Sequence, residues 1–106
     1  MRKFVFLAGG KEIGWSELEL GDPPMGVAFG RFHPSEHYSP PHASIEVRTP
    51  DGLEMKASGG VCILDGSDVL GLEAIEVSVL GIVSPAYDAL FPEHVAAYEA
   101  QFRQGA

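Results

Sequence analysis

Residues 44–58 read SIEVRTPDGLEMKAS, and this stretch decides the fold class. Apolar and charged side chains alternate on both sides of the sequence Pro50-Asp51-Gly52. A period of two is typical of half-buried β-strands, and the turn suits a glycine at its positive-φ position. The stretch therefore predicts a β-hairpin with a buried face and a charged face. The buried face comprises Ile45, Val47, Leu53 and Met55, and the charged face, where opposite charges can pair across the strands, comprises Glu46, Arg48, Glu54 and Lys56.

Further strands are predicted on both sides of this hairpin. Residues 3–8 are mostly apolar and precede two glycines, and residues 25–30 alternate bulky side chains with glycine or alanine. Residues 61–64 form another short apolar run, and residues 75–79 alternate isoleucine and valine with polar side chains. Because one face of residues 25–30 is nearly bare, we expect backbone or a ligand to pack closely against it.

The C-terminal residues follow a helical pattern. Pro92 can open a helix that runs to about residue 104, with an apolar stripe formed by Phe91, Val95, Tyr98 and Phe102. Such a stripe predicts that the helix covers the sheet, so that Tyr98 and Phe102 share a core with Val47, Met55 and Val77. The predicted fold is α+β, with residues 1–106 as a single globular domain. It has about six mostly antiparallel strands in a curved sheet or small open barrel, with the C-terminal amphipathic helix packed on one face.

The composition excludes several classes of function. Seven basic and fifteen acidic residues give a net charge of −8, which repels phosphate and argues against nucleic-acid binding. No apolar run approaches the roughly 20 residues of a membrane-spanning helix. Cys62 is the only cysteine and lies in an apolar run, which predicts a small buried side chain and no internal disulfide. The apolar run near the start, FVFLA, is too short for a signal-peptide core, so a cytoplasmic location is expected.

Residues 32–42, FHPSEHYSPPH, concentrate the side chains with the most chemistry. Three histidines and a tyrosine lie on a connector that three prolines stiffen. A tyrosine held on a stiff loop loses little conformational freedom on docking, which suits an interface. The basic side chain at the end of the preceding strand can contact a carboxylate or phosphate. The candidate partner- or ligand-binding residues are Arg31, His33, His37, Tyr38 and His42.

Metal binding and catalysis find less support in the same residues. The spacing of His33 and His37 can place two imidazoles on one side of a helical turn, but Pro40-Pro41 forces an extended chain before His42. The spacing matches no established zinc signature, so neither a metal nor another cofactor is predicted. The sequence contains no nucleophile elbow and no phosphate-binding loop, and no catalytic residue is assigned.

Two aromatic residues outside the loop have alternative readings. Trp15 fits a lid on the core or a binding residue. His94, in the first turn of the C-terminal helix, is expected to be solvated or to contact Glu93 or Asp88.

Two functions follow as hypotheses. The first is a small acidic noncatalytic binding protein, such as an inhibitor, an immunity-type protein or an adaptor, which presents residues 32–42 to a protein partner. The charge favours a basic protein as this partner, with a second copy of the chain as another candidate and with no role for nucleic acid or membrane. The alternative is a small enzyme, or a small-ligand or metal-binding protein, with a pocket lined by the loop histidines.

Overall fold

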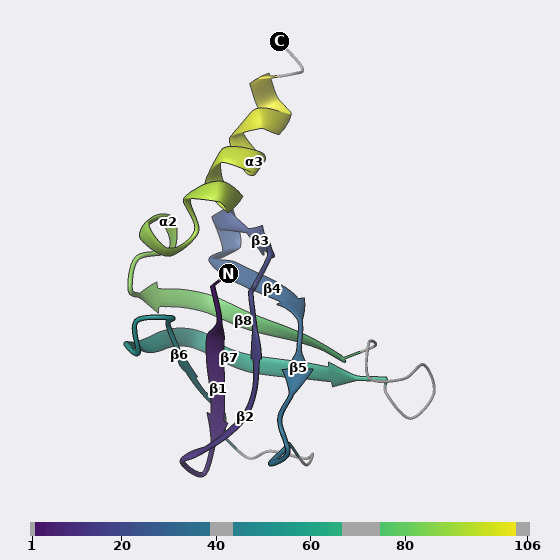
Figure 1. Ribbon diagram of the computed structural model, residues 1–106. Coiled ribbons are helices and arrows are strands. Elements are labelled where there is room, and N and C mark those ends of the chain that lie inside the picture. The colour runs from purple at the N-terminus through teal and green to yellow at the C-terminus, as the bar shows by residue number, and fades with distance from the viewer. Residues whose placement is uncertain (1, 39–43, 67–74, 104–106) are drawn as a thin grey trace.

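The computed structural model describes residues 2–38, 44–66 and 75–103, and all structural statements below concern these residues. Eight strands form an antiparallel sheet, and a short 3-10 helix and two α-helices complete the fold (Figure 1). The strands are β1 (Phe4–Ala8), β2 (Lys11–Ser16), β3 (Leu20–Asp22), β4 (Val27–Arg31), β5 (His33–Pro34), β6 (Glu46–Arg48), β7 (Glu54–Asp65) and β8 (Ile75–Ser84). The helices are η1 (Pro23–Met25), α2 (Tyr87–Leu90) and α3 (Pro92–Arg103).

The sheet curls back towards itself because the segment from β4 to β5 pairs with strands at both ends of the sheet. The strand order is β3-β4-β8-β7-β6-β1-β2-β5. Only Phe32 separates β4, which pairs with β8, from β5, which pairs with β2. Figure 1 shows β1 and β2 crossing the long strands β7 and β8 at a steep angle, as expected for two layers of one strongly coiled sheet. The α+β prediction is confirmed, with eight strands in place of about six.

The hairpin that decided the fold class is present. Val47 pairs with Met55 and both are buried, whereas Arg48 pairs with Glu54 on the outer face. The Gly52 backbone is in the left-handed region at φ +87°, where glycine has no steric penalty. Two details differ from the prediction. The Arg48 guanidinium lies 3.7 Å from Glu46 on its own strand, and Leu53 lies just outside β7 with 57% of its surface exposed.

The two strands predicted on either side of Gly59-Gly60 are one continuous twelve-residue strand, β7. Its pairing with β8 shifts register between Ala57 and Gly60, and Gly60 has φ +77°. An irregularity of this kind bends a strand without ending it, and glycine makes it inexpensive. The sequence Gly59-Gly60 therefore marks a bend rather than a turn.

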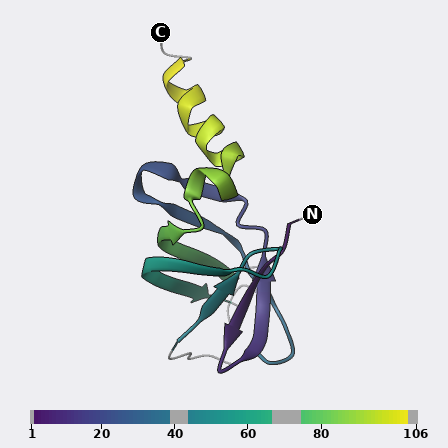
Figure 2. The same cartoon turned by 90° about the vertical axis from the view of Figure 1, so that its left-hand side faces the viewer.

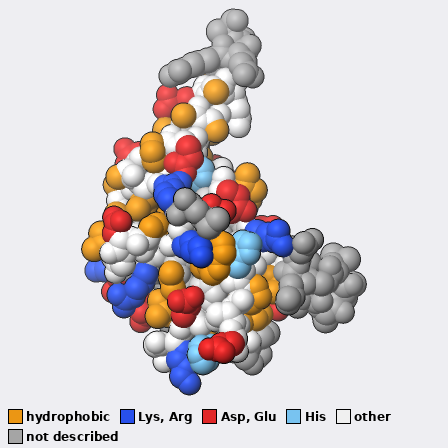
Figure 3. Space-filling view, in the orientation of Figure 1, with side chains coloured by type: hydrophobic (Ala, Val, Ile, Leu, Met, Phe, Trp, Pro, Cys, Tyr) orange, Lys and Arg blue, Asp and Glu red, His pale blue; other side chains and the backbone are white. Residues whose placement is uncertain are grey.

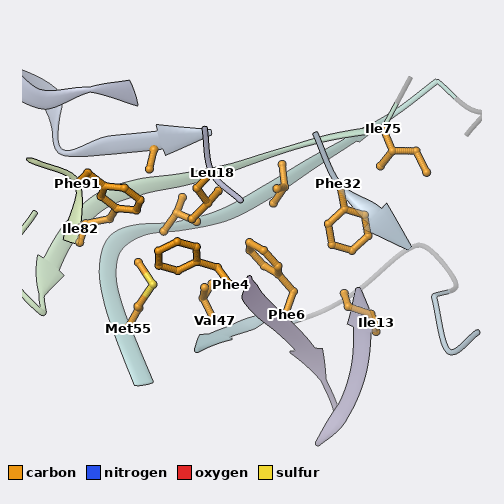
Figure 4. Close-up of a cluster of buried hydrophobic side chains, with 13 residues drawn as sticks. Phe4, Phe6, Ile13, Leu18, Phe32, Val47, Met55, Ile75, Ile82 and Phe91 are labelled. Atoms are coloured by element: carbon orange, nitrogen blue, oxygen red, sulfur yellow. The ribbon is translucent and has the colours of Figure 1, made fainter. Parts of the chain in front are cut away.

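Side chains from both layers of the sheet meet in one core (Figure 4). Phe4 and Phe6, two residues apart on β1, both point into the core. Phe6 pairs with Gly14 on β2 and with Val47 on β6. On the other layer Val77 and Val79 of β8 are fully buried. The Phe6 ring meets Phe32 edge-on at 5.6 Å, so the residue that links β4 to β5 also anchors that link in the core.

Cys62 corrects one expectation about burial. Its side chain is exposed, because Cys62 pairs with Ser78 on the outer face while Val61 and Ile63 turn towards the core. The apolar run 61–64 suggested burial on both faces, but only alternate residues are covered. No helix in the described ranges has the length and apolar character needed to cross a membrane.

The nearly bare face of β4 is covered by the protein itself. A methyl group at Gly30 would overlap the carboxylate of Glu19, and Glu19 Oε2 accepts a hydrogen bond from the Arg31 backbone N–H at 2.9 Å. At Gly26, the backbone of Gly81 and Ile82 would lie within 3.6 Å of an added methyl group. Both backbone, as expected, and the Glu19 side chain therefore pack against this face.

The helix α3 meets the sheet through its first turn and then projects away from it (Figures 1 and 2). Phe91, immediately before the helix, is fully buried, and His94 is 95% buried beside β3. Gly21 allows this contact, since a methyl group there would overlap both Tyr87 Oη and the His94 ring. Further along, Tyr98 and Phe102 pack edge-on against each other, and Phe102 is 64% exposed. The prediction that these two aromatics join the core is therefore wrong.

Candidate binding surface

The imidazole of His33 stacks on the indole of Trp15. The two residues are directly opposite each other in β5 and β2, and their ring centroids are 4.0 Å apart at an interplanar angle of 15°. The ammonium group of Lys3 lies 4.4 Å from the centroid of the indole. Since the imidazole already covers one face of the indole, the ammonium must lie over the other face. We call Lys3, Trp15 and His33 the indole stack.

The indole stack belongs to a row of outward-facing side chains that crosses four strands. Residues opposite each other in an antiparallel pair point to the same face, so Arg48, Val5, Trp15 and His33 follow one another across β6, β1, β2 and β5. Figure 3 shows hydrophobic, histidine and basic side chains side by side over these strands. The row is aromatic and basic at Trp15, His33 and Lys3, whereas Arg48 at its other end lies beside Glu46 and opposite Glu54.

Two groups in the indole stack have no polar partner. In the described part of the chain, no carboxylate lies within salt-bridge distance of Lys3, and no hydrogen bond reaches the His33 ring. The N–H groups of both side chains are therefore open to solvent or to a ligand.

The segment that follows His33 is fixed at its base by Ser35. The Ser35 backbone N–H donates to Ile13 O at 2.8 Å, and its hydroxyl donates to Glu12 O at 2.6 Å. The same hydroxyl accepts a longer contact of 3.4 Å from the His37 N–H, and Ser35 O accepts one of 3.1 Å from Tyr38. These bonds continue the β2–β5 pairing into a turn, and nothing in the sequence singled out Ser35 for this role.

Tyr38 connects this turn to the end of β7. Its hydroxyl donates to Asp65 Oδ2 at 2.7 Å, and its ring lies 5.4 Å from that of Phe32. Burial raises the pKa of Tyr38 well above its ordinary value, and the hydrogen bond to Asp65 and the charge of that carboxylate act in the same direction. Tyr38 is thus half-buried and tied to the fold, so its replacement is expected to affect stability as well as any binding.

The remaining predicted residues have separate surroundings. His37 is exposed in the turn, with Nε2 3.7 Å from Glu36 Oε1. Arg31 is exposed at the end of β4, opposite Glu76. His42 lies outside the described residues. Within them, no group of three or more histidine, cysteine or acidic side chains is arranged to hold a metal ion.

Two hollows that described residues line on the surface lie elsewhere. One of about 380 Å³ separates the 49–53 turn from α2 and is lined by Phe4, Leu53 and Leu90 among others. The other, of about 240 Å³, lies between β3 and α3 and is lined by Leu20, His94 and Tyr98 among others. Neither His33 nor His37 lines either hollow.

The sequence pattern predicts His33 as a site residue and leaves Trp15 as either a lid on the core or a binding residue. Nothing in the pattern indicates Lys3. The signal that relates them is the register of β1, β2 and β5, which places residues far apart in the chain on one outer row. That register depends on an irregularity between Phe6 and Leu7, which periodicity does not reveal.

The fold and this surface define an α+β protein with a curled antiparallel sheet and an exposed aromatic and cationic row. Comparison with known proteins adds no relative, because no family model matches the chain and neither curated proteins nor solved structures give a match.

Proposed function

We propose that this protein is a small noncatalytic binding protein of the cytoplasm, which presents the 32–42 segment and the adjoining indole stack to a protein partner. The observation that carries the proposal is the stacking of His33 on Trp15 at 4.0 Å with the Lys3 ammonium on the opposite face of the ring. Aromatic side chains of this kind dominate the binding energy of many protein interfaces.

The order already present in this surface supports a role in binding. A side chain that is fixed before association loses less conformational entropy when it docks. Trp15 and His33 hold each other, Ser35 fixes the base of the segment, and Tyr38 is bonded to Asp65. The unpaired N–H groups of Lys3 and His33 can donate to carboxylates or carbonyl groups of a partner.

A pocket for a small substrate finds less support. The two hollows described above are lined by other residues, and the bare face of β4 is filled by Glu19. Within the described residues, the indole stack therefore supports binding more directly than any hollow supports a small enzyme with a histidine-lined pocket.

Site-specific photo-crosslinking in cells tests the proposal. A benzophenone amino acid at position 37, in the exposed turn, should give a discrete crosslinked product with a protein partner. The same group at position 83 is the control, because Val83 is 65% exposed on β8 and belongs neither to the segment nor to the indole stack. Equal products at both positions, or none at position 37, would contradict the proposal.

A further inference from the structure

The helix α3 has one buried side chain, and that side chain is titratable. Of the α3 residues whose side chains the structure describes, only His94 is buried, with 5% of its surface exposed. Its ring lies against β3 at Gly21 and stacks on Phe91 at 4.7 Å, whereas the later turns of the helix project away from the sheet (Figure 1). The attachment of α3 therefore depends largely on one imidazole.

The surroundings of His94 fit a neutral ring. Nδ1 lies 3.1 Å from the hydroxyl of Tyr87, which donates to Val27 O at 2.8 Å, so the neutral ring carries its proton on Nδ1. The buried Nε2 has no hydrogen-bond partner among the described residues. A second proton would be added to Nε2, which would bury a charge that no described residue accepts in a hydrogen bond. Release of the ring to water would remove this penalty.

Charged and titratable groups surround this ring and its partner hydroxyl on each element packed against them. They are Arg2 before β1, Glu19 before β3, Asp22 at the end of β3, Tyr87 in α2 and Glu93 beside His94 in α3. Burial lowers the pKa of His94 below its ordinary value of 6.5, and the charge of Arg2 acts in the same direction. The carbonyl groups of Glu19 and Leu18 and the Glu19 carboxylate act in the opposite direction without reversing the change. A released ring has the ordinary pKa, so acidification below this value favours the released helix over the attached one.

We propose that His94 is an acid-sensitive latch, which holds α3 on the sheet while its ring is neutral and releases the helix when the ring is protonated. The sheet stays folded, because Phe91 precedes the helix and keeps its place in the core. Another tie to the first turn is the exposed ion pair of Arg2 with Glu93, and such pairs contribute little. An opening that breaks few buried contacts requires less free energy than global unfolding. The latch is separate from the indole stack, so the inference does not depend on the proposed function.

Spin labels on the full chain test the latch. A nitroxide is attached in the projecting part of α3, through Gln101→Cys in a Cys62→Ser background, and electron paramagnetic resonance measures its mobility. The mobile fraction should rise about 3-fold or more between pH 7.5 and pH 5, because a helix of this length is marginal once it is detached. In His94→Phe, which retains an aromatic ring without the titration, the mobile fraction should not change with pH. A label at position 56, which is exposed on β7, should keep the same mobility throughout.

Gly21→Ala provides a matched variant at neutral pH. Its methyl group would overlap Tyr87 Oη and the His94 ring, so the label at position 101 should already be mobile at pH 7.5 while the label at position 56 is not. A constant mobile fraction in the parent protein, an equal rise in His94→Phe, or an immobile label in Gly21→Ala would overturn the inference. A parallel rise at position 56 would also overturn it, because it would show that the whole chain unfolds. Where His94→Phe does not fold, as judged by near-ultraviolet circular dichroism, His94→Gln takes its place.

Discussion

His94 is the residue whose surroundings differ most from its expected role as a solvated side chain. Its ring stacks parallel to Phe91 at 4.7 Å, and Nδ1 lies 3.1 Å from the hydroxyl of Tyr87, which donates to Val27 O at 2.8 Å. The buried Nε2 has no hydrogen-bond partner among the described residues. Because the Tyr87 proton is directed to Val27, Nδ1 carries the proton of the neutral ring.

Burial lowers the pKa of His94 below its ordinary value of 6.5, and the positive charge of Arg2 acts in the same direction. The carbonyl groups of Glu19 and Leu18 and the charge of Glu19 oppose this change without reversing it. The neighbouring Tyr87 has a pKa raised to about 12, first by burial and then by Asp22, so it stays protonated across the neutral range. The folded protein therefore favours an uncharged His94.

This arrangement predicts a loss of stability on acidification that is specific to His94. As the pH falls through 6.5, the unfolded chain binds a proton before the folded chain does, so the free energy of unfolding decreases until the folded pKa is passed. In His94→Phe the ring stack is retained but the titration is lost. The stability difference between wild type and His94→Phe should therefore shift against the wild type between pH 7.5 and pH 5, as measured by urea unfolding.

Val95→Ala is the control for this titration. It removes contacts from the same helix turn without removing a titratable group, so its stability difference from the wild type should not change with pH. A constant difference for His94→Phe as well would show that His94 is not held in its neutral form.

At the scale of single residues, the sequence predicted types of side chain better than their surroundings. Phe102 and Tyr98 have the right spacing for a core stripe, and His94 occupies the position of a solvated first-turn residue. In the structure His94 is buried and Phe102 is exposed. The reason is that the helix meets the sheet at Gly21, where the absence of a side chain leaves room for the His94 ring. No local pattern indicates at which point along a helix the contact occurs.

The elements themselves were predicted with more success. Pro92 opens α3 and the hairpin around Gly52 forms, because both depend on backbone preferences that are local in sequence. Local patterns did not show whether two neighbouring apolar runs form one strand or two. Gly59-Gly60 bends one strand where the sequence predicted two separate strands.

The attachment of α3 can be tested by two truncations. A chain that ends at residue 97 loses the projecting part of the helix and should lose only about 1 kcal/mol of stability, because the removed side chains bury little apolar surface. A chain that ends at residue 90 also loses Phe91, which is fully buried, and His94. Removal of a buried phenylalanine side chain alone costs about 3–5 kcal/mol, so this chain should fail to melt cooperatively.

Circular dichroism melts of the two truncated chains show whether α3 is attached by its first turn alone or along its whole apolar stripe. If the chain ending at residue 97 also lost its cooperative melt, the outer turns of α3 would be part of the core, as the apolar stripe suggested.

At the scale of the whole molecule, the sheet was predictable in kind but its curvature was not. Alternation identified antiparallel strands, yet the return of the sheet depends on Phe32. This buried residue links β4, which pairs with β8, to β5, which pairs with β2. The same passage brings His33 onto Trp15. The candidate surface is thus a consequence of the topology, and the sequence could name its histidine without showing what stacks on it.

The net charge of −8 likewise conceals an uneven distribution. The indole stack gathers the ammonium of Lys3, the indole of Trp15 and the imidazole of His33 at one place on the surface of an acidic chain. A partner of the indole stack must therefore be recognised by short-range contacts rather than by the field of the whole protein.

The affinity of the partner captured through position 37 tests the central claim most directly. Calorimetric titration compares the wild type with Lys3→Ala, His33→Ala and Lys56→Ala. Lys56 is an exposed lysine on β7, so its removal changes the net charge as much as the removal of Lys3 does. The account predicts that Lys3→Ala and His33→Ala each weaken binding about 10-fold or more, while Lys56→Ala stays within about 2-fold of the wild type. Equal affinities for all four proteins would contradict it.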